Sequence, residues 1–159
     1  MAKAFTVTMD GVDALNKKLE GLKYDMIKKG GRFALRKAAQ VIRDQARSNA
    51  QRLDSSETGR SIASNITEKW NGRINKLTGD LAFRVGVNQG AVLPKKGEHP
   101  DEAAGGPTPH WRLLEFGTEK MAARPFMVPA MEQSAQAATD KFISTYGPAL
   151  DRALKKAGG

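Results

Sequence analysis

The chain has 159 residues, a length typical of one domain, and its composition of 40% hydrophobic and 27% charged residues excludes wholesale disorder. Its formal net charge of +9 suggests an acidic partner such as nucleic acid. The positive excess is spread along the chain, however, with no run of five like charges. Composition alone therefore does not define a phosphate-binding face.

The absence of cysteine excludes disulfides, thiolate nucleophiles and zinc sites built on thiolates. No apolar run approaches the roughly 18–20 residues that a membrane span needs, and the start of the chain has no apolar core of a signal peptide. We therefore expect a soluble, unexported protein with no membrane partner.

The first elements are predicted from their periodicity. Phe5, Val7 and Met9 alternate with polar residues and predict a short N-terminal strand. The following apolar residues fall at helical steps of three and four and define one helix face: Val12, Leu15, Leu19, Leu22 and Met26.

Gly30-Gly31 interrupts this helical pattern, which resumes from Phe33 to Ala46. Either two helices meet at the glycines or one long helix bends there, and we favour one bent helix. The polar stretch 48–60 is predicted to be a loop.

Two strands are predicted next, at residues 61–70 and 80–88, where apolar and polar residues alternate. Turn-forming residues lie between them, so we predict an antiparallel hairpin with a wide loop. One face of each strand is apolar, and the long helix is expected to cover it.

Residues 89–109 are rich in glycine and proline and predict a mobile loop, either a disordered insertion or a functional loop that becomes ordered on assembly. A short helix is predicted from Trp111 to Phe116, stopped by Gly117, and a final helix after Pro125, broken or kinked at Gly147-Pro148. This order predicts an α+β fold and a single domain over residues 1–159.

The search for chemistry finds no phosphate-binding loop, dinucleotide-binding turn, zinc-protease motif or nucleophile elbow. His99 and His110 lie in or beside the long loop without the spacing of known metal sites. We therefore expect no catalytic residue, cofactor or metal. Of Glu115 and Glu119, which lie four residues apart, one is expected to be solvated and the other to accept hydrogen bonds from backbone donors.

The most distinctive segment covers residues 110–130, HWRLLEFGTEKMAARPFMVPA. Its apolar anchors are predicted to be Trp111, Leu114 and Phe116, and Pro125 is expected in the first turn of the last helix. Glu115 and Arg124 are expected to pair across the turn and to act as structural or interface residues.

This segment resembles the neck or tail-completion protein family of long-tailed bacteriophages. The resemblance rests on His110, Glu115-Phe116-Gly117-Thr118, Ala123-Arg124-Pro125-Phe126 and Pro129-Ala130. Gly11 to Leu15 is similar to the opening of family members, and Thr58 to Ile62 is similar to a Thr-Gly-x-Leu-x-x-Ser-Ile element, with the Leu missing and the spacing shortened. From this resemblance we expect interface or structural roles for His110, Trp111, Leu114, Glu115, Phe116, Gly117, Thr118, Arg124, Pro125, Phe126 and Pro129.

The resemblance implies a non-enzymatic virion protein, assembled in the host cytoplasm, whose copies form a ring at the head-to-tail junction. The ring would complete the tail or join it to the DNA-filled head. Its implied partners are other copies of the chain and neighbouring neck and tail proteins, namely head-closure, tail-terminator or tail-tube proteins. Nucleic acid would be a partner only as DNA passing through the channel.

Two other classes of protein remain as alternatives. A basic nucleic-acid-binding module is suggested by Arg32, Arg36 and Arg43, which project on nearly one side of a helix. The row lacks a series of interleaved aromatic residues for base stacking, since Phe33 is the single aromatic residue between Arg32 and Arg43 in the sequence, and this counts against the class. A small hydrolase using His99 or His110 is the third class, with no motif to support it.

Overall fold

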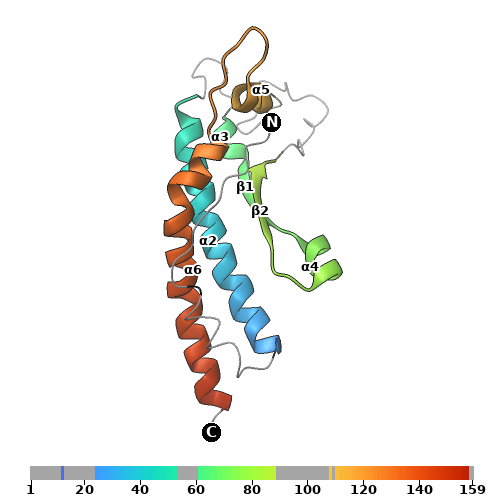
Figure 1. The fold of residues 1–159 in the computed structure, drawn as a ribbon, viewed down its shortest axis with the longest axis vertical. Coiled ribbons are helices and arrows are strands. Elements are labelled where there is room, and N and C mark those ends of the chain that lie inside the picture. Colours follow the sequence, from blue (N-terminus) through green and yellow to red (C-terminus); the bar gives the residue numbers. More distant parts are fainter. Residues whose placement is uncertain (1–11, 13–23, 54–60, 89–107, 109, 158–159) are drawn as a thin grey trace, which may run out of the picture. The chain divides into compact units, whose positions relative to one another are not determined.

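The computed structural model describes residues 12, 24–53, 61–88, 108 and 110–157. Its named elements in the described part are α2 (Tyr24–Gln51), α3 (Ile62–Asn65), β1 (Ile66–Trp70), α4 (Gly72–Thr78), β2 (Phe83–Val87), α5 (Trp111–Phe116) and α6 (Met127–Ala157) (Figure 1). This order, with two long helices and a small sheet, confirms the predicted α+β class.

The sheet contains β1 and β2 as antiparallel neighbours. Its register is set at the two ends, where the N–H of Asn88 donates to the carbonyl of Asn65 and the N–H of Asn71 donates to the carbonyl of Ala82. The predicted antiparallel hairpin is therefore confirmed, but the wide loop predicted between its strands is wrong, because that segment contains the helix α4.

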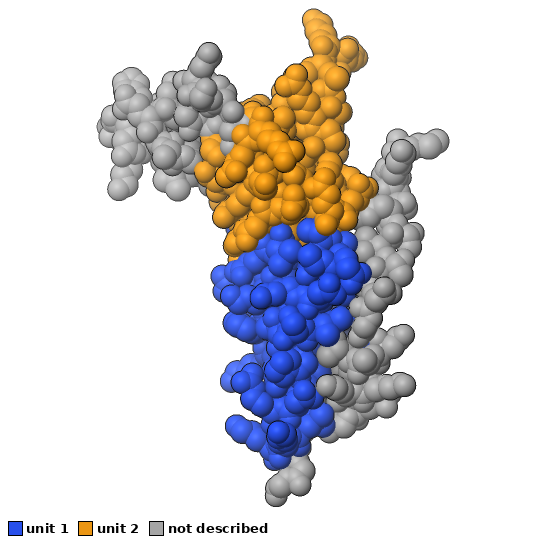
Figure 2. All heavy atoms as spheres, turned by 90° about the vertical axis from the view of Figure 1, so that its left-hand side faces the viewer, with its two compact units in different colours: residues 1–41, 69–84, 134–159 blue, residues 42–68, 85–133 orange. Residues whose placement is uncertain are grey.

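The chain divides into two compact units, which Figure 2 colours separately. Unit 1 comprises residues 1–41, 69–84 and 134–159, and unit 2 comprises residues 42–68 and 85–133. The borders fall inside α2, α6 and both strands, so each unit has its own part of these elements. The single domain stays a prediction.

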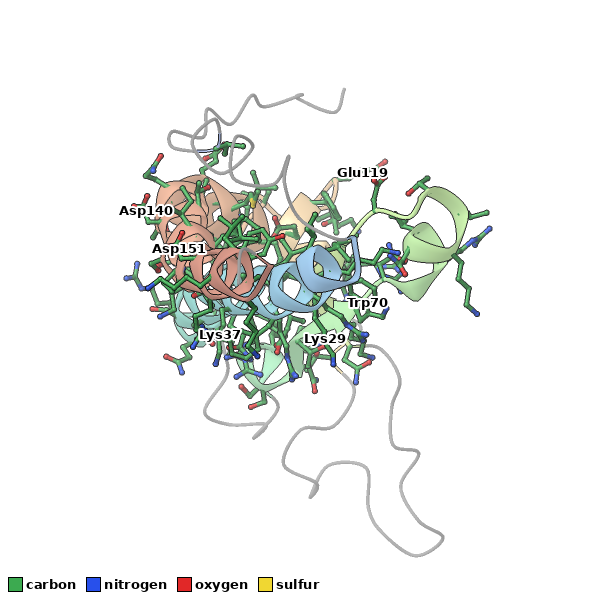
Figure 3. The ribbon with its side chains drawn as sticks, turned by 90° about the horizontal axis from the view of Figure 1, so that it is seen from below. Lys29, Lys37, Trp70, Glu119, Asp140 and Asp151 are labelled. Carbon is green, nitrogen blue, oxygen red and sulfur yellow. The ribbon has the colours of Figure 1, made fainter. Side chains whose placement is uncertain are left out.

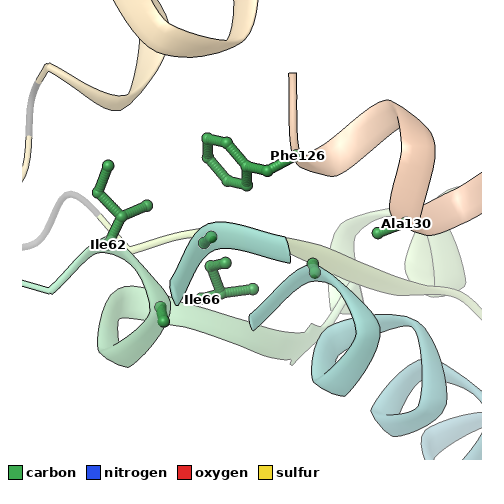
Figure 4. Packing of buried hydrophobic residues seen from close by; sticks show 7 residues of the cluster. Ile62, Ile66, Phe126 and Ala130 are labelled. Carbon is green, nitrogen blue, oxygen red and sulfur yellow. The ribbon is translucent and has the colours of Figure 1, made fainter. Parts of the chain in front are cut away.

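The core of unit 2 is a cluster of small and branched side chains around one aromatic ring (Figure 4). Ala46 and Ala50 of α2 have side chains small enough to let Ile66 of β1 approach closely, and Phe126 fills the remaining space with no exposed surface. Val85 and Val87 of β2 pack against the same cluster. The prediction that the long helix covers the apolar face of the sheet is thus confirmed.

The core of unit 1 forms around Tyr146 of α6, together with Ala34 and Leu150. The Tyr146 ring lies against the backbone of α2, since a Cβ added at Gly30 would be 3.2 Å from its Cε2 atom. The Tyr146 hydroxyl donates to the carbonyl of Ile27 at 3.0 Å. The two glycines therefore serve helix packing. The prediction of one helix through them is confirmed, because α2 includes both residues, and the bend stays a prediction.

Three predicted boundaries are wrong. The loop predicted from residue 48 begins later, because α2 continues to Gln51 and buries Ala50. The first half of the predicted strand 61–70 is the helical turn α3, since the Ser61 hydroxyl caps it by accepting from the N–H of Ser64 and two consecutive residues, Ile62 and Ala63, are buried.

The third wrong boundary is the break at Gly147-Pro148, because α6 continues through both residues, whereas the alternative of a kink stays a prediction. Pro148 is exposed, so water can satisfy the carbonyl group whose helical donor the proline removes. The N-terminal strand, the helical residues 13–23 and the loop 89–107 lie outside the described residues, and their predictions stay predictions.

Candidate functional site: the junction of α5 and α6

The start and end of α5 are set by backbone contacts. The N–H of Trp111 donates to the carbonyl of Thr108 at 3.2 Å, and the N–H of Gly117 donates to the carbonyl of Leu113 at 2.9 Å. Gly117 has a φ of 74°, and a Cβ there would lie 2.8 Å from the backbone nitrogen of Ala123. The helix is therefore predicted correctly at both ends, and only glycine fits its C-terminal position.

The chain after Gly117 folds back on α5. Thr118 and Met121 form an isolated antiparallel bridge, and the Thr118 hydroxyl accepts a 3.3 Å hydrogen bond from the N–H of Lys120. The N–H of Arg124 then donates to the carbonyl of Leu114 at 2.7 Å. These contacts bring the segment before α6 back beside α5.

The Glu115 carboxylate joins the two helices. It is only 5% exposed and accepts hydrogen bonds from the N–H groups of Phe126, Met127 and Val128, at 2.8, 3.0 and 3.1 Å. These donors belong to the N-terminus of α6, where the first N–H groups lack helical partners and the helix dipole favours a negative charge. We call Glu115 and these three N–H groups the Glu115 latch.

The latch decides two predictions. Glu119 is exposed (Figure 3), while Glu115 accepts from backbone donors, so the expected division between these carboxylates is confirmed. The predicted pair of Glu115 with Arg124 is wrong: among the described residues the carboxylate has no contact with that guanidinium, and the Arg124 side chain is exposed. The three N–H groups already take up both carboxylate oxygens.

The predicted apolar anchors divide into buried and exposed ones. Trp111 and Leu114 pack partly buried on the core of unit 2, where Phe126 is fully buried. Phe116 is 73% exposed, so its prediction as an anchor within the chain is wrong. Pro125 precedes the first helical residue Met127, and the proline inside the first turn is Pro129.

An exposed apolar set accompanies the latch in unit 2. Leu113 and Phe116 are three residues apart and so share one side of α5. Met121 and Val128, at 36% and 44% exposed, come from the turn and from the first turn of α6. We call these four residues the α5 apolar set.

Two polar side chains of α2, Asn49 and Gln45, form hydrogen bonds with residues at the start of α6. The Asn49 amide nitrogen donates to the carbonyl of Phe126 and to the Gln133 side chain, both at 3.3 Å, and Gln45 donates to the same Gln133 oxygen at 3.2 Å. Sequence reasoning missed these residues, because polar residues on a predicted helix carry no signal of a partner some 80 positions away. The imidazole of His110 is exposed and makes no capping hydrogen bond to α5.

Among the described residues, one buried donor at this junction lacks a hydrogen-bond partner. It is the Nε1 atom of Trp111, and the guanidinium of Arg112 lies 5.6 Å from the centroid of the same ring. A buried donor without an acceptor costs about 1–3 kcal/mol. The Trp111 ring therefore stabilises the core of unit 2 through its apolar contacts, and the burial of its N–H group reduces this stabilisation.

Two arginines of the predicted basic row, Arg32 and Arg43, contact groups of the protein itself. In unit 1, the Arg32 guanidinium lies 4.2 Å from the centroid of the Trp70 ring. In unit 2, Arg43 forms 2.7 Å ion pairs with Glu68 and Asp44. Arg47, which follows the row on α2, donates twice to the carbonyl of Ile66.

The pKa of Arg43 shows the effect of these pairs. Burial lowers the pKa of this guanidinium, but its hydrogen bonds and charge interactions with Asp44 and Glu68 more than offset burial and raise the pKa above its ordinary value. Arg43 is therefore a permanently charged group held by carboxylates of its own unit.

Within the described part of the chain, no group of three or more histidine and acidic side chains is placed to hold a metal ion. His99 lies outside the described residues. None of the helices in the described part is both long and apolar enough to cross a membrane.

The fold is mostly helical, and the Glu115 latch fixes two of its helices, α5 and α6, to each other. Residues 13–117 match the model of the HK97-gp10-like family, bacteriophage HK97 gp10 and similar tail components. The match covers about two thirds of the chain, which therefore belongs to this family of bacteriophage tail components. No curated protein and no solved structure matches the chain.

Family membership gives the coarse function. A tail component is a structural protein of the virion and contacts other structural proteins of the phage. The match ends at Gly117 and so includes Glu115 but not the donors of the latch.

Proposed function

We propose that the protein acts at the head-to-tail junction, where copies of the chain assemble in a ring that completes the tail or joins it to the DNA-filled head. The observation that carries the proposal is the α5 apolar set beside the Glu115 latch, in a chain that belongs to a tail-component family. The Glu115 carboxylate, Gly117 and the bridge at Thr118 hold this set in place, and the other residues of the segment singled out from the sequence are proposed to belong to the same interface.

The α5 apolar set has the properties of an assembly interface. Phe and Met are enriched at protein interfaces, and an exposed Phe116 contributes little to the stability of the free chain. Burying one such ring against a partner is worth about 1.5–3 kcal/mol. The latch, the bridge at Thr118 and Gly117 hold the segment in one conformation, so little entropy is lost when a partner binds.

Heterologous contacts are the kind that build a ring. If the α5 apolar set of one copy binds a different surface on the next copy, each copy uses both surfaces once, and the assembly closes when the rotation between neighbours divides a full turn. In this proposal the DNA passes through the channel of the ring. The ion pair of Arg43 with Glu68 and the hydrogen bonds of Arg47 to the Ile66 carbonyl support a role for both arginines in the fold and not in DNA recognition.

The test compares two exposed phenylalanines. We expect Phe116→Ser to weaken ring formation, seen by mass photometry, and to block complementation of a phage that lacks the protein. Phe33→Ser is the matched control, since Phe33 is 58% exposed on α2 of unit 1. Both variants should melt like the parent protein. Unchanged rings and full complementation by Phe116→Ser would refute the proposal.

A further inference from the structure

The helix α4 lies between the two strands and has no buried residue. Its two large apolar side chains are exposed, Leu77 by 75% and Ile74 by 39%. A helix of seven residues is marginal in water without tertiary contacts. The structure must therefore hold α4 by other means, and its apolar residues contribute little to the fold.

Polar caps hold both ends of α4. The Asn71 side chain is buried and accepts from the N–H of Ile74 at 3.4 Å. At the other end Gly79 adopts a φ of 80°, and its N–H donates to the carbonyl of Asn75 at 3.0 Å. The Asn75 amide returns hydrogen bonds to the carbonyls of Gly79 and Asp80. The helix is thus preorganised by side-chain hydrogen bonds.

The base of α4 is fixed by an aromatic contact. Trp70 packs edge-on against Phe83, with ring centroids 5.3 Å apart, and Arg32 of α2 covers its ring. A Cβ at Gly72 would be 3.4 Å from the Trp70 Nε1 atom, so the first residue of α4 packs directly against the Trp70 indole. Figure 3 shows Trp70 between α2 and α4.

The charges of α4 are all positive. Its sequence GRINKLT contains Arg73 and Lys76 and no acidic residue. Both basic side chains, with Gly72 and Leu77, line a shallow and mainly apolar hollow, to which the methylene stems of the basic residues contribute. The surface of α4 therefore combines an apolar centre with a positive rim.

We propose that α4 is a docking element that inserts Leu77 and Ile74 into an apolar socket rimmed by aspartate or glutamate on a different protein of the virion. The positive rim would fit an acidic socket and would disfavour a second copy of this chain, whose net charge is +9. Nucleic acid fits less well, because α4 offers exposed aliphatic side chains and no aromatic ring for base stacking. This surface is separate from the α5 apolar set and goes beyond ring formation.

The charge test uses filled heads and finished tails from a phage that lacks this protein, joined by adding the purified full chain. We expect Arg73→Glu/Lys76→Glu to lower the yield of infectious particles at least tenfold. The control is Lys155→Glu/Lys156→Glu, which makes the same charge change at two exposed residues in the last turn of α6 and should retain activity. Both variants should melt like the parent, because none of these residues is buried.

The partner is identified by placing a photo-crosslinking amino acid, benzoylphenylalanine, at position 77. A crosslink to another virion protein, beside Asp or Glu residues, supports the proposal. A crosslink to a second copy of the chain, a crosslink to DNA, or full activity of Arg73→Glu/Lys76→Glu overturns it. Ring formation by the α4 variants is measured in parallel, so that failure of this proposal is distinguished from failure of the ring proposal.

Discussion

Replacement of Glu115 by alanine tests the latch directly. It leaves three N–H groups at the start of α6 without an acceptor, and the N–H of Phe126 belongs to a fully buried residue. Each unsatisfied buried donor costs about 1–3 kcal/mol, with the lower end applying to the partly exposed Met127 and Val128. Loss of the charge at the helix N-terminus adds about 0.3–2 kcal/mol.

These costs add to about 3–7 kcal/mol. Because Met127 and Val128 are partly exposed and water can reach their N–H groups, we expect Glu115→Ala to lower the free energy of unfolding by an amount near the lower end, about 3–4 kcal/mol. Glu115→Gln keeps the size and one acceptor oxygen but turns an NH₂ group toward the N–H donors, so it should lose about half of that, about 1–2 kcal/mol. Urea unfolding measures both changes. In a thermal melt, the alanine variant should unfold roughly 10 °C lower, at about 2–4 °C per kcal/mol for a chain of this size.

Arg124→Ala separates the latch from an ion pair. If Glu115 acted through Arg124, both alanine variants would lose similar stability and the double mutant would be less harmful than the sum. The structure instead predicts that Arg124→Ala changes stability by less than about 0.5 kcal/mol, because only its backbone N–H is engaged. Glu115→Ala within about 1 kcal/mol of the parent, or equal losses in both variants, would refute the latch.

Three further changes have defined outcomes. Gly117→Ala should destabilise by about 2 kcal/mol or more in urea unfolding, because φ is 74° and its Cβ would meet the Ala123 backbone at 2.8 Å; a loss below about 0.5 kcal/mol would contradict this. Trp111→Phe should be neutral or stabilising in the same assay, since it removes a buried donor without a partner; a large loss would mean that the indole N–H is bonded. Burial raises the pKa of Tyr146, so the folded state holds this proton more tightly than the unfolded state. The resulting stability is present below the unfolded pKa of about 10 and falls as pH rises through the folded pKa. Tyr146→Phe should reduce that alkaline loss, and equal pH profiles would refute the assignment.

Local signals in the sequence predicted the parts of the fold that local physics decides. The bounds of α5 follow from its apolar residues and from the glycine that ends it. The sequence also predicted that one of Glu115 and Glu119 accepts from backbone donors, and the structure shows that it is Glu115. The exposure of Phe116 could not be predicted, because an apolar residue kept for a partner has the same sequence pattern as one kept for the core.

The misassigned elements have a common cause. The helix α4 has no buried residue, so it lacks the apolar periodicity by which helices are recognised. Its flanking Asn71 and Gly79 are cap residues, but the same residue types also mark turns, and the segment was predicted as a loop. The predicted pairing of Glu115 with Arg124 was wrong for a related reason. A nearby arginine is visible in the sequence as a partner for a carboxylate, whereas the sequence does not show which backbone N–H groups will donate to it.

The latch also bears on where the chain can be cut. The family match ends at Gly117, yet the three donors that hold Glu115 and the Phe126 ring that fills the core of unit 2 come from later residues. A fragment limited to residues 13–117 would keep a carboxylate without its donors and would expose Ile62 and Ile66 to water. The shortest fragment that preserves unit 2 therefore extends past Ala130, and the end of the recognisable family sequence is not a boundary at which the chain can fold.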